Sequence, residues 1–241
     1  MILLFTDFGN ADIYAGQLKA RLLRDHPKAA IVDLLHDAPS FDAKAGAHLL
    51  AALAPQLARG VTLAVVDAGV GSARRPVVLQ ADDAWYAGPD NGLLSIVAAR
   101  AKTCRCWEIV WRPQPLSHSF HGRDLFAPIV AMLDAGDWWP EALREISVLN
   151  SEFGPDDLAE VIYVDHYGNA VTGLRSGNLP HDAQIMLAGH KLGYARVFSE
   201  VAQGTLFWYE NSIGLVEIAV NCGHAAKALG IGVGSVISVA G

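Results

Sequence analysis

The stretch VTLAVVDAGVGSARR, residues 61–75, joins an apolar run to an acid, a glycine-rich turn and two arginines. The β-branched run predicts a buried strand, and Asp67 stands where that strand ends. Because ligands in an open α/β sheet bind outside the carboxyl ends of the strands, Asp67 and Arg74 are candidate site residues. An ordinary ion pair across the loop is the alternative. No GK[ST] triplet follows the glycines, which excludes a P-loop.

Short aliphatic runs and helix-like stretches alternate on both sides of this segment. This pattern is typical of an α/β domain with a mostly parallel sheet flanked by helices. Asp42 is expected to cap its helix. We expect strands at 2–6, 29–35, 61–67, 76–82 and 104–111, a strand, turn and helix within 85–101, and helices at 14–24, 42–57 and 124–134.

The character of the chain changes at SEFGPDD, residues 151–157, which is polar and rich in turn formers. Beyond it, seven short strand-like runs follow one another with turns between them. We therefore predict an N-terminal α/β domain over 1–152 and a smaller C-terminal all-β, barrel-like domain over 157–241.

Composition narrows the class of partner. The 241 residues carry a net charge of −7 and no Lys/Arg cluster longer than Arg74–Arg75, which argues against a nucleic-acid partner and for a small-molecule substrate. The apolar runs are far shorter than the roughly 20 residues that span a bilayer. The start lacks a basic leader, so a cytoplasmic protein with no membrane partner is expected. The 52% hydrophobic content is high enough to suggest subunit interfaces as well as a core.

Three cysteines cannot all pair with one another, and this indicates a reduced compartment. Cys104 and Cys106 are too close in sequence for an ordinary disulfide bridge. They could be half of a zinc site, but no second cysteine pair or nearby histidine completes one. Buried strand cysteines are the simpler interpretation.

Two further polar turns belong to the N-terminal half. In TDFG, Asp7 follows an expected strand and either binds a ribose diol or caps the next helix. In SHSFHGRD, residues 117–124, a metal is conceivable, but His118 and His121 precede the helix and do not share a face of it. Arg123 and Asp124 are interpreted as a loop anchor and an N-cap.

Two segments of the C-terminal half place polar residues among apolar ones. Asp165 and Asn169 flank the turn of VDHYGNAVTGL, which taken alone is equally a hairpin corner. In ENSIGLVEIAVNCG the polar side chains Ser212, Glu217 and Asn221 could edge a pocket, since alternate strand residues face opposite sides.

Taken in order, TDFG, VDAGVGSARR, GPDNGLLS, FHGRDLFAP, DHYGNAVTG and SIGLVEIAVN resemble the S-adenosyl-L-methionine hydroxide adenosyltransferase family, relatives of the fluorinase and chlorinase enzymes. The likeness spans the chain. It implies hydrolysis of S-adenosyl-L-methionine to adenosine and L-methionine without a cofactor or metal. It also implies a homotrimer with sites between subunits.

The same resemblance implies roles for individual residues. The family's reactive set falls on Asp67, Arg74 and His121, and all three are present, which favours water over a halide as nucleophile. Two residues depart from the family pattern: Ala68 replaces a proline, and Val220 replaces an arginine that halogenases use near adenine. The substrate contacts implied are Asp7 with the ribose hydroxyls, Phe41 with the reaction centre, Asp165 and Ser212 with the methionine ends, Asn169 with adenosine and Phe198 with adenine.

Three alternative functions differ in what becomes of S-adenosylmethionine. A non-catalytic protein that binds S-adenosylmethionine or adenosine leaves the substrate intact. A halogenase-like enzyme of the same fold would bind an anionic nucleophile beside Asp67, and the negative charge of the Asp67 carboxylate disfavours this. A methyltransferase would leave S-adenosylhomocysteine, but the glycine-rich turn usual after its first strand is absent here.

Overall fold

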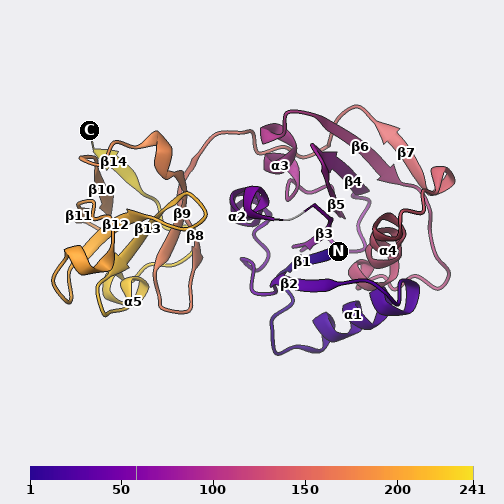
Figure 1. Cartoon of the computed structure of the whole chain (residues 1–241), viewed down its shortest axis with the longest axis horizontal. Helices are drawn as coiled ribbons and strands as arrows, with labels where there is room; N and C mark the ends of the chain where they lie inside the picture. The colour runs from indigo at the N-terminus through magenta and orange to yellow at the C-terminus, as the bar shows by residue number, and fades with distance from the viewer. Residues whose placement is uncertain (58, 241) are drawn as a thin grey trace. The chain divides into compact units, whose positions relative to one another are not determined.

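The computed structural model describes residues 1–57 and 59–240 (Figure 1). Two compact units make up the chain. The first comprises Met1–Ala51 and Leu57–Pro155, and the second comprises Ala52–Gln56 and Asp156–Gly241. The domain bounds 1–152 and 157–241 stay predictions, and residue 241 lies outside the described residues.

The first unit is built on one seven-stranded sheet in the order β2-β1-β3-β5-β4-β6-β7. The four strands β2, β1, β3 and β5 are parallel, whereas β4, β6 and β7 join antiparallel. This confirms the α/β class. The strands are β1 (Ile2–Thr6), β2 (Ile31–Leu35), β3 (Val61–Val65), β4 (Pro76–Ala81), β5 (Ala84–Pro89), β6 (Cys104–Ile109) and β7 (Leu143–Ile146).

Alternate residues of the central strands point to opposite sides of this sheet, so both of its faces carry apolar side chains. Helices cover each face. Ile2 and Leu4 belong to a core with Leu18 and Ile129, which lie on α1 (Ile13–Asp25) and α4 (Ala127–Ala135). Figure 1 shows these two helices packed beside each other. On the other face α2 (Ala43–Leu53) brings Gly46 against Phe5 and Val66. The short helix α3 (Ser95–Arg100) packs on β4.

Helix α2 begins as predicted and ends early. The backbone N–H of Ala45 donates to the Asp42 carboxylate at 2.9 Å, so the predicted cap is confirmed. The α-helix stops at Leu53 and one 3-10 turn (Ala54–Gln56) follows. Pro55 explains the change, since it has no N–H to donate to the preceding turn.

The expected helix at 124–134 begins earlier than predicted. A π-helical turn (Gly122–Phe126) precedes α4, and α4 ends before Gly136, whose φ is 79°. The predicted N-cap role of Asp124 is therefore wrong, because this residue lies inside the turn. Its carboxylate instead accepts from the backbone N–H of Ser117 at 3.1 Å and from the Arg123 guanidinium. Arg123 also donates to Gln17 on α1 at 2.9 Å, which fits a loop anchor.

The second unit consists of antiparallel strands, as expected for an all-β part, but its described strands form two sheets instead of a closed barrel. One sheet has the order β12-β13-β9-β8 and the other β11-β10-β14. Trp208 lies fully buried in the core, and its indole N–H donates to the Ala183 carbonyl at 3.1 Å. The strands are β8 (Leu158–Val164), β9 (Ala170–Arg175), β10 (Gln184–Leu187), β11 (His190–Leu192), β12 (Leu206–Glu210), β13 (Leu215–Val220) and β14 (Ser238–Ala240).

A few elements and exposures differ from expectation. Strand β7 and the five-residue helix α5 (Ala225–Leu229) were not anticipated. Cys104 and Cys106 do lie on a strand, β6, yet Cys104 is exposed and Cys106 half-buried, so their predicted burial is wrong. All three cysteines are free thiols. Among the helices described, none combines the length and the apolar character needed to cross a bilayer.

Candidate functional site

Asp67 and Arg74 form a buried, two-pronged ion pair in the loop after β3. The Arg74 Nε donates to Asp67 Oδ1 at 2.7 Å, and Nη2 donates to Oδ2. Their side chains are 4% and 9% exposed for Asp67 and Arg74 respectively. Asn91 fixes the start of this loop, since its side-chain amide donates to the Val66 carbonyl at 2.8 Å. The ion pair that was the alternative interpretation of these two residues is therefore present, in a geometry that fixes both side chains.

Gly71 allows the same loop to meet the segment that carries His121. Its φ is +82°, and a Cβ there would lie 2.7 Å from the carbonyl oxygen of His118. Only glycine adopts this conformation without strain and leaves room for that carbonyl. The glycine-rich turn thus serves a close approach between two protein loops.

His121 stands at the start of the π-helical turn and contributes a half-buried imidazole. Burial lowers the pKa of His121, and the nearby positive charges of Arg74 and Arg112 lower it further. The neutral ring is thereby favoured near pH 7. Burial also lowers the pKa of Arg74, to about 10, which leaves it protonated.

Two buried nitrogens of this group have no hydrogen-bond partner among the described residues: His121 Nδ1 and Arg74 Nη1. Buried polar atoms are nearly always paired, so a pair of unsatisfied donors or acceptors needs an explanation. Both belong to the candidate reactive set. A small polar ligand is the partner that their chemistry suits.

A cavity of about 60 Å³ brings three of the predicted residues together, Asp7, Asp67 and His121. Phe8, Val65, Val70, Ser119, Phe120 and Gly122 complete its wall. Burial raises the pKa of Asp7, while a hydrogen bond from the backbone N–H of Phe41 to its carboxylate, 3.2 Å long, opposes that rise. The wall of the cavity thus combines carboxylate and imidazole groups with the rings of Phe8 and Phe120.

Phe41 is held in an unusual conformation beside this cavity. Its φ of 63° lies in the left-handed region, which non-glycine residues rarely adopt. Its side chain is 80% exposed, so no packing within the unit accounts for the conformation. Strain of this kind often marks a functional site, and the bond to Asp7 is what fixes the residue here.

A hydrogen-bond network around buried Thr6 and His36, which ends at the exposed Asp33, was not predicted from the sequence. His36 Nδ1 lies 2.7 Å from Thr6 Oγ1, and its Nε2 lies 3.1 Å from Asp33 Oδ1. Thr6 Oγ1 in turn accepts from the backbone N–H of Phe8 at 3.3 Å. This network fixes the chain on both sides of Asp7. The only sequence signal was a histidine next to an acid-containing strand, which is too common to single out.

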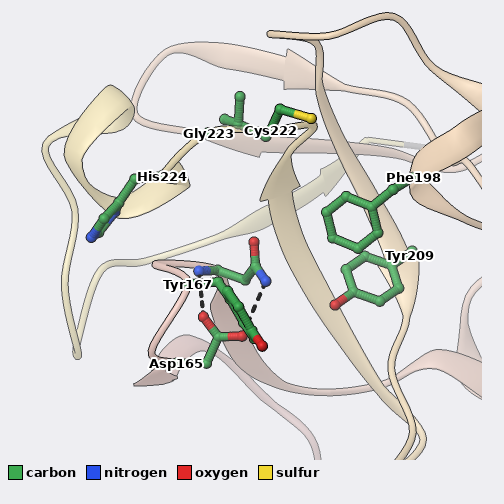
Figure 2. A pocket seen from close by; sticks show the side chains of 9 residues that line it. Asp165, Tyr167, Phe198, Tyr209, Cys222, Gly223 and His224 are labelled. Atoms are coloured by element: carbon green, nitrogen blue, oxygen red, sulfur yellow. Dashed lines mark hydrogen bonds between the residues drawn. The ribbon is translucent and has the colours of Figure 1, made fainter.

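The second unit contains a larger pocket of about 660 Å³ (Figure 2). Asp165 and Asn169 lie on one side of it, joined by two hydrogen bonds: from Asn169 N to Oδ1 at 2.8 Å and from Asn169 Nδ2 to Oδ2 at 3.0 Å. The residues that line it are Asp165, Tyr167, Asn169, Phe198, Tyr209, Val220, Cys222, Gly223 and His224.

Aromatic rings form another side of this pocket. Figure 2 shows Phe198 and Tyr209 next to each other, and their ring centroids are 5.3 Å apart. Phe198 also packs edge-on against Phe207 at 5.1 Å. The rings of Phe198 and Tyr209 together offer a flat ligand an apolar surface to lie against.

Glu217 lies behind the pocket, almost fully buried at 5% exposure. Its carboxylate accepts from the Tyr209 hydroxyl at 2.5 Å and from the Asn211 amide at 2.9 Å. Burial raises the pKa of Glu217, although these two hydrogen bonds oppose the rise. Glu217 therefore orients Tyr209 and does not itself line the pocket.

Two predicted residues lie away from the pocket lining. Ser212 is exposed in the turn between β12 and β13. Asn221 uses its side-chain amide to donate to the Val201 carbonyl at 2.8 Å, which anchors the loop after Phe198. Tyr167, Tyr209 and His224 line the pocket without having been predicted.

Gly168 is the residue of the sequence that could have indicated where the His224 ring lies, because only glycine leaves room for it. Its φ is +86°, and a Cβ there would overlap the His224 ring at 2.0 Å.

No group of three or more His, Cys, Asp or Glu side chains suited to a metal occurs within residues 1–57 and 59–240. His118 and His121 accordingly form no such cluster.

Comparison with known proteins gives one consistent result. Residues 2–143 match the family described as SAM hydroxide adenosyltransferase N-terminal domain, and residues 159–238 match the corresponding C-terminal domain. Relatives named (R)-S-adenosyl-L-methionine hydrolase include proteins of Salinispora arenicola and Thermus thermophilus, each 37% identical. The alignments cover 97% of this chain and 95% of the first relative, and 94% of each chain for the second.

Solved structures agree with these matches. An uncharacterized conserved protein from Thermotoga maritima aligns over 100% of both chains with a TM-score of 0.91 and 30% identity. A conserved hypothetical protein from Thermus thermophilus aligns over 99% of both chains with a TM-score of 0.79 and 34% identity.

Proposed function

The chain belongs to the SAM hydroxide adenosyltransferase family, and we infer that it hydrolyses S-adenosyl-L-methionine to adenosine and L-methionine. The names of its relatives specify the (R) epimer at sulfur, and we extend that preference to this chain. The observation that carries the inference is the 60 Å³ cavity that joins Asp67, His121 and Asp7, together with a buried nitrogen of His121 and one of Arg74 that have no partner among the described residues.

The cavity suits water as the nucleophile. Each buried water needs about 10–15 Å³ and two to four polar partners, so a space of 60 Å³ has room for a few waters and not for the whole substrate. Asp67 and His121 line the cavity and offer carboxylate oxygens and a ring nitrogen. Arg74, bonded to Asp67, carries a second buried nitrogen without a partner among the described residues. A halide would meet the Asp67 carboxylate, which repels an anion.

The reaction is a displacement at ribose carbon 5′. The water oxygen forms a bond to that carbon as the bond to sulfur breaks, and the sulfur keeps the electron pair and leaves as the neutral thioether of methionine. The water loses one proton, which Asp67 or neutral His121 accepts. Because the sulfonium already leaves readily, most of the acceleration comes from holding water in line with the breaking bond.

Arg74 has two roles in this scheme. Its double hydrogen bond holds the Asp67 carboxylate in one orientation. Its charge stabilises the hydroxide character that develops on the water, and this effect is strong because the pair is removed from solvent. Asp7, fixed by Phe41 and by the network around Thr6, is suited to accept hydrogen bonds from the ribose hydroxyls.

The larger pocket of the second unit suits the rest of the substrate. At 660 Å³ it falls in the range of small-molecule sites. We assign adenine stacking to Phe198, adenosine contact to Asn169, and the methionine ends to Asp165 and Ser212, with Glu217 and Asn221 as supports. We also propose that the protein is a homotrimer in which this pocket completes the 60 Å³ cavity of a neighbouring chain. S-adenosylmethionine is then the substrate, with no cofactor and no metal.

The free thiols support a reducing compartment, and we propose the cytoplasm.

The main alternative to hydrolysis is a protein that binds S-adenosylmethionine without turnover. Incubating the pure protein separately with the (R) and (S) epimers, followed by chromatography, distinguishes the two. We expect adenosine and methionine, formed faster from the (R) epimer. Unchanged substrate would overturn the enzyme, and S-adenosylhomocysteine would indicate a methyltransferase. Sedimentation of the same sample tests the trimer.

A further inference from the structure

Two thiols lie side by side on β6, outside both sites described above. Cys104 and Cys106 are separated by one residue, so their side chains leave the strand on the same face. Their sulfur atoms are 3.9 Å apart. Cys104 is exposed, Cys106 is half-buried, and neither belongs to a disulfide. The pair is therefore preformed and accessible.

The strand neighbours of the pair are apolar, while the carboxylates of Asp82, Asp90 and Glu152 lie near enough to act on the thiols electrostatically. Leu79 and Ala81 on β4 are the register partners of Cys106 and Cys104, and Ile146 on β7 is the other partner of Cys106. The residue between the thiols, Arg105, binds Glu145 and lies over the Trp107 ring at 4.9 Å. Its charge is thus already engaged. In the part of the chain that the structure describes, no third His, Cys, Asp or Glu joins the thiols in a metal-ligand group.

The thiolate is the form of cysteine that binds metals, so both thiols lose their protons when a cation binds.

We propose that Cys104 and Cys106 form a two-coordinate site for a soft monovalent cation, Cu(I) or Ag(I). Thiolates select soft metals, and two ligands without a third satisfy a cation that binds linearly but not zinc, which takes four. With metal–sulfur bonds near the ~2.3 Å of zinc thiolates, a linear unit needs sulfurs ~4.6 Å apart, a widening of ~0.7 Å from 3.9 Å. Small side-chain rotations supply that. Two S–H bonds break, two sulfur–metal bonds form, two protons leave to solvent, and no electron is transferred.

Anaerobic titration of the full chain with Cu(I), in competition with a colorimetric Cu(I) chelator, tests the site. Wild-type protein and Cys222→Ser should each take up one Cu(I) with the same affinity, because Cys222 is a lone thiol. Cys104→Ser and Cys106→Ser should each weaken binding by more than about 100-fold, since even a lost second-shell contact costs up to ~100-fold. Ag(I) should give the same order of affinities. X-ray absorption of the copper form should report two sulfur neighbours.

Equal Cu(I) affinity in Cys104→Ser and wild type would overturn the site, and so would an equal loss in Cys222→Ser. Cys104→Ser and Cys106→Ser replace an exposed and a half-buried thiol with a side chain of similar size, and their circular dichroism should match that of the wild type. The readout is independent of the proposed hydrolase activity. Metal binding can therefore fail while hydrolysis stands, or the reverse.

Discussion

The cavity of the first unit and the pocket of the second unit differ in almost every physical respect. The cavity is about 60 Å³ and contains a carboxylate fixed by a guanidinium, whereas the pocket is about 660 Å³ and has the rings of Phe198 and Tyr209 together in its wall. A small charged cavity can polarise a few waters, and a large aromatic pocket can hold an organic ligand. Changes in the first should therefore lower kcat, and changes in the second should raise KM.

The largest effect should come from Asp67→Asn. The substitution keeps the shape of the side chain but removes the proton acceptor, and it leaves the buried Arg74 charge without its partner. General acid–base groups contribute about 10²–10⁴-fold, so kcat should fall by roughly 10³-fold. Steady-state kinetics and a separate measurement of adenosine binding check the result.

Asp83→Asn is the matched control for that change. Asp83 pairs with Arg59 at 2.7 Å, but both side chains are largely exposed, and such a pair contributes little. Its kinetics should equal those of the wild type. If Asp67→Asn also keeps the wild-type kcat, Asp67 is not the group that activates water.

The next largest effect should come from Phe198→Ala, in the other region. Stacking of a base on an aromatic ring is worth about 1–3 kcal/mol, so KM should rise roughly 10- to 100-fold while kcat changes little. Phe198→Leu keeps apolar contact with Phe207 and Tyr209 but lacks the flat face, and it should lose nearly as much. Adenosine binding by calorimetry is the measurement. A variant that loses kcat alone would place Phe198 outside the adenine site.

The two regions also differ in how far the sequence predicted them. The cavity followed from residues at the ends of apolar runs, because a parallel sheet gathers those ends at one edge. The pocket depends on side-chain directions in turns and short strands. Asn221 illustrates this: it is polar in a strand context, yet its amide is used to anchor the loop after Phe198.

Rules based on local sequence also placed some helix ends and turns wrongly, because they do not include contacts made by the folded chain. Asp124 is a residue type typical of an N-cap, but its carboxylate is held by the backbone N–H of Ser117 and by the neighbouring Arg123 guanidinium, and the helix starts earlier. Helix α5 has only five residues, too few for a periodic pattern. The left-handed Phe41 could not be predicted at all, since its conformation depends on Asp7, 34 residues away.

A subtler change tests the charge environment of the cavity. The pKa of His121 is lowered by burial and by positive charges that include the exposed Arg112. If neutral His121 is needed, activity falls as pH drops through that lowered pKa, below the ordinary 6.5. Arg112→Gln removes one positive charge, so the pKa of His121 rises and the acid limb of kcat should move to higher pH by a fraction of a unit.

The pH profile of kcat in low salt measures that shift. Raising the ionic strength should shrink the difference between Arg112→Gln and wild type, because Arg112 is exposed and its field is screened. Arg144→Gln, which removes an exposed arginine paired with Glu108, is the control and should leave the limb in place. A shift of the limb toward lower pH in Arg112→Gln would contradict a neutral, functional His121.

The smallest effect should come from Glu217→Gln, behind the pocket of the second unit. Burial raises the pKa of Glu217 above the ordinary 4.5, so the folded protein favours the protonated form more than the unfolded chain does. That stabilisation is fully present below pH 4.5 and is lost as pH rises through the folded pKa. The free energy of unfolding of wild type relative to Glu217→Gln should therefore decline between about pH 4 and 7, by under about 1 kcal/mol. Glu210→Gln, an exposed position on β12, should show no such trend in urea unfolding. A relative stability that increases with pH would mean that the bonds from Tyr209 and Asn211 outweigh burial and hold Glu217 ionised.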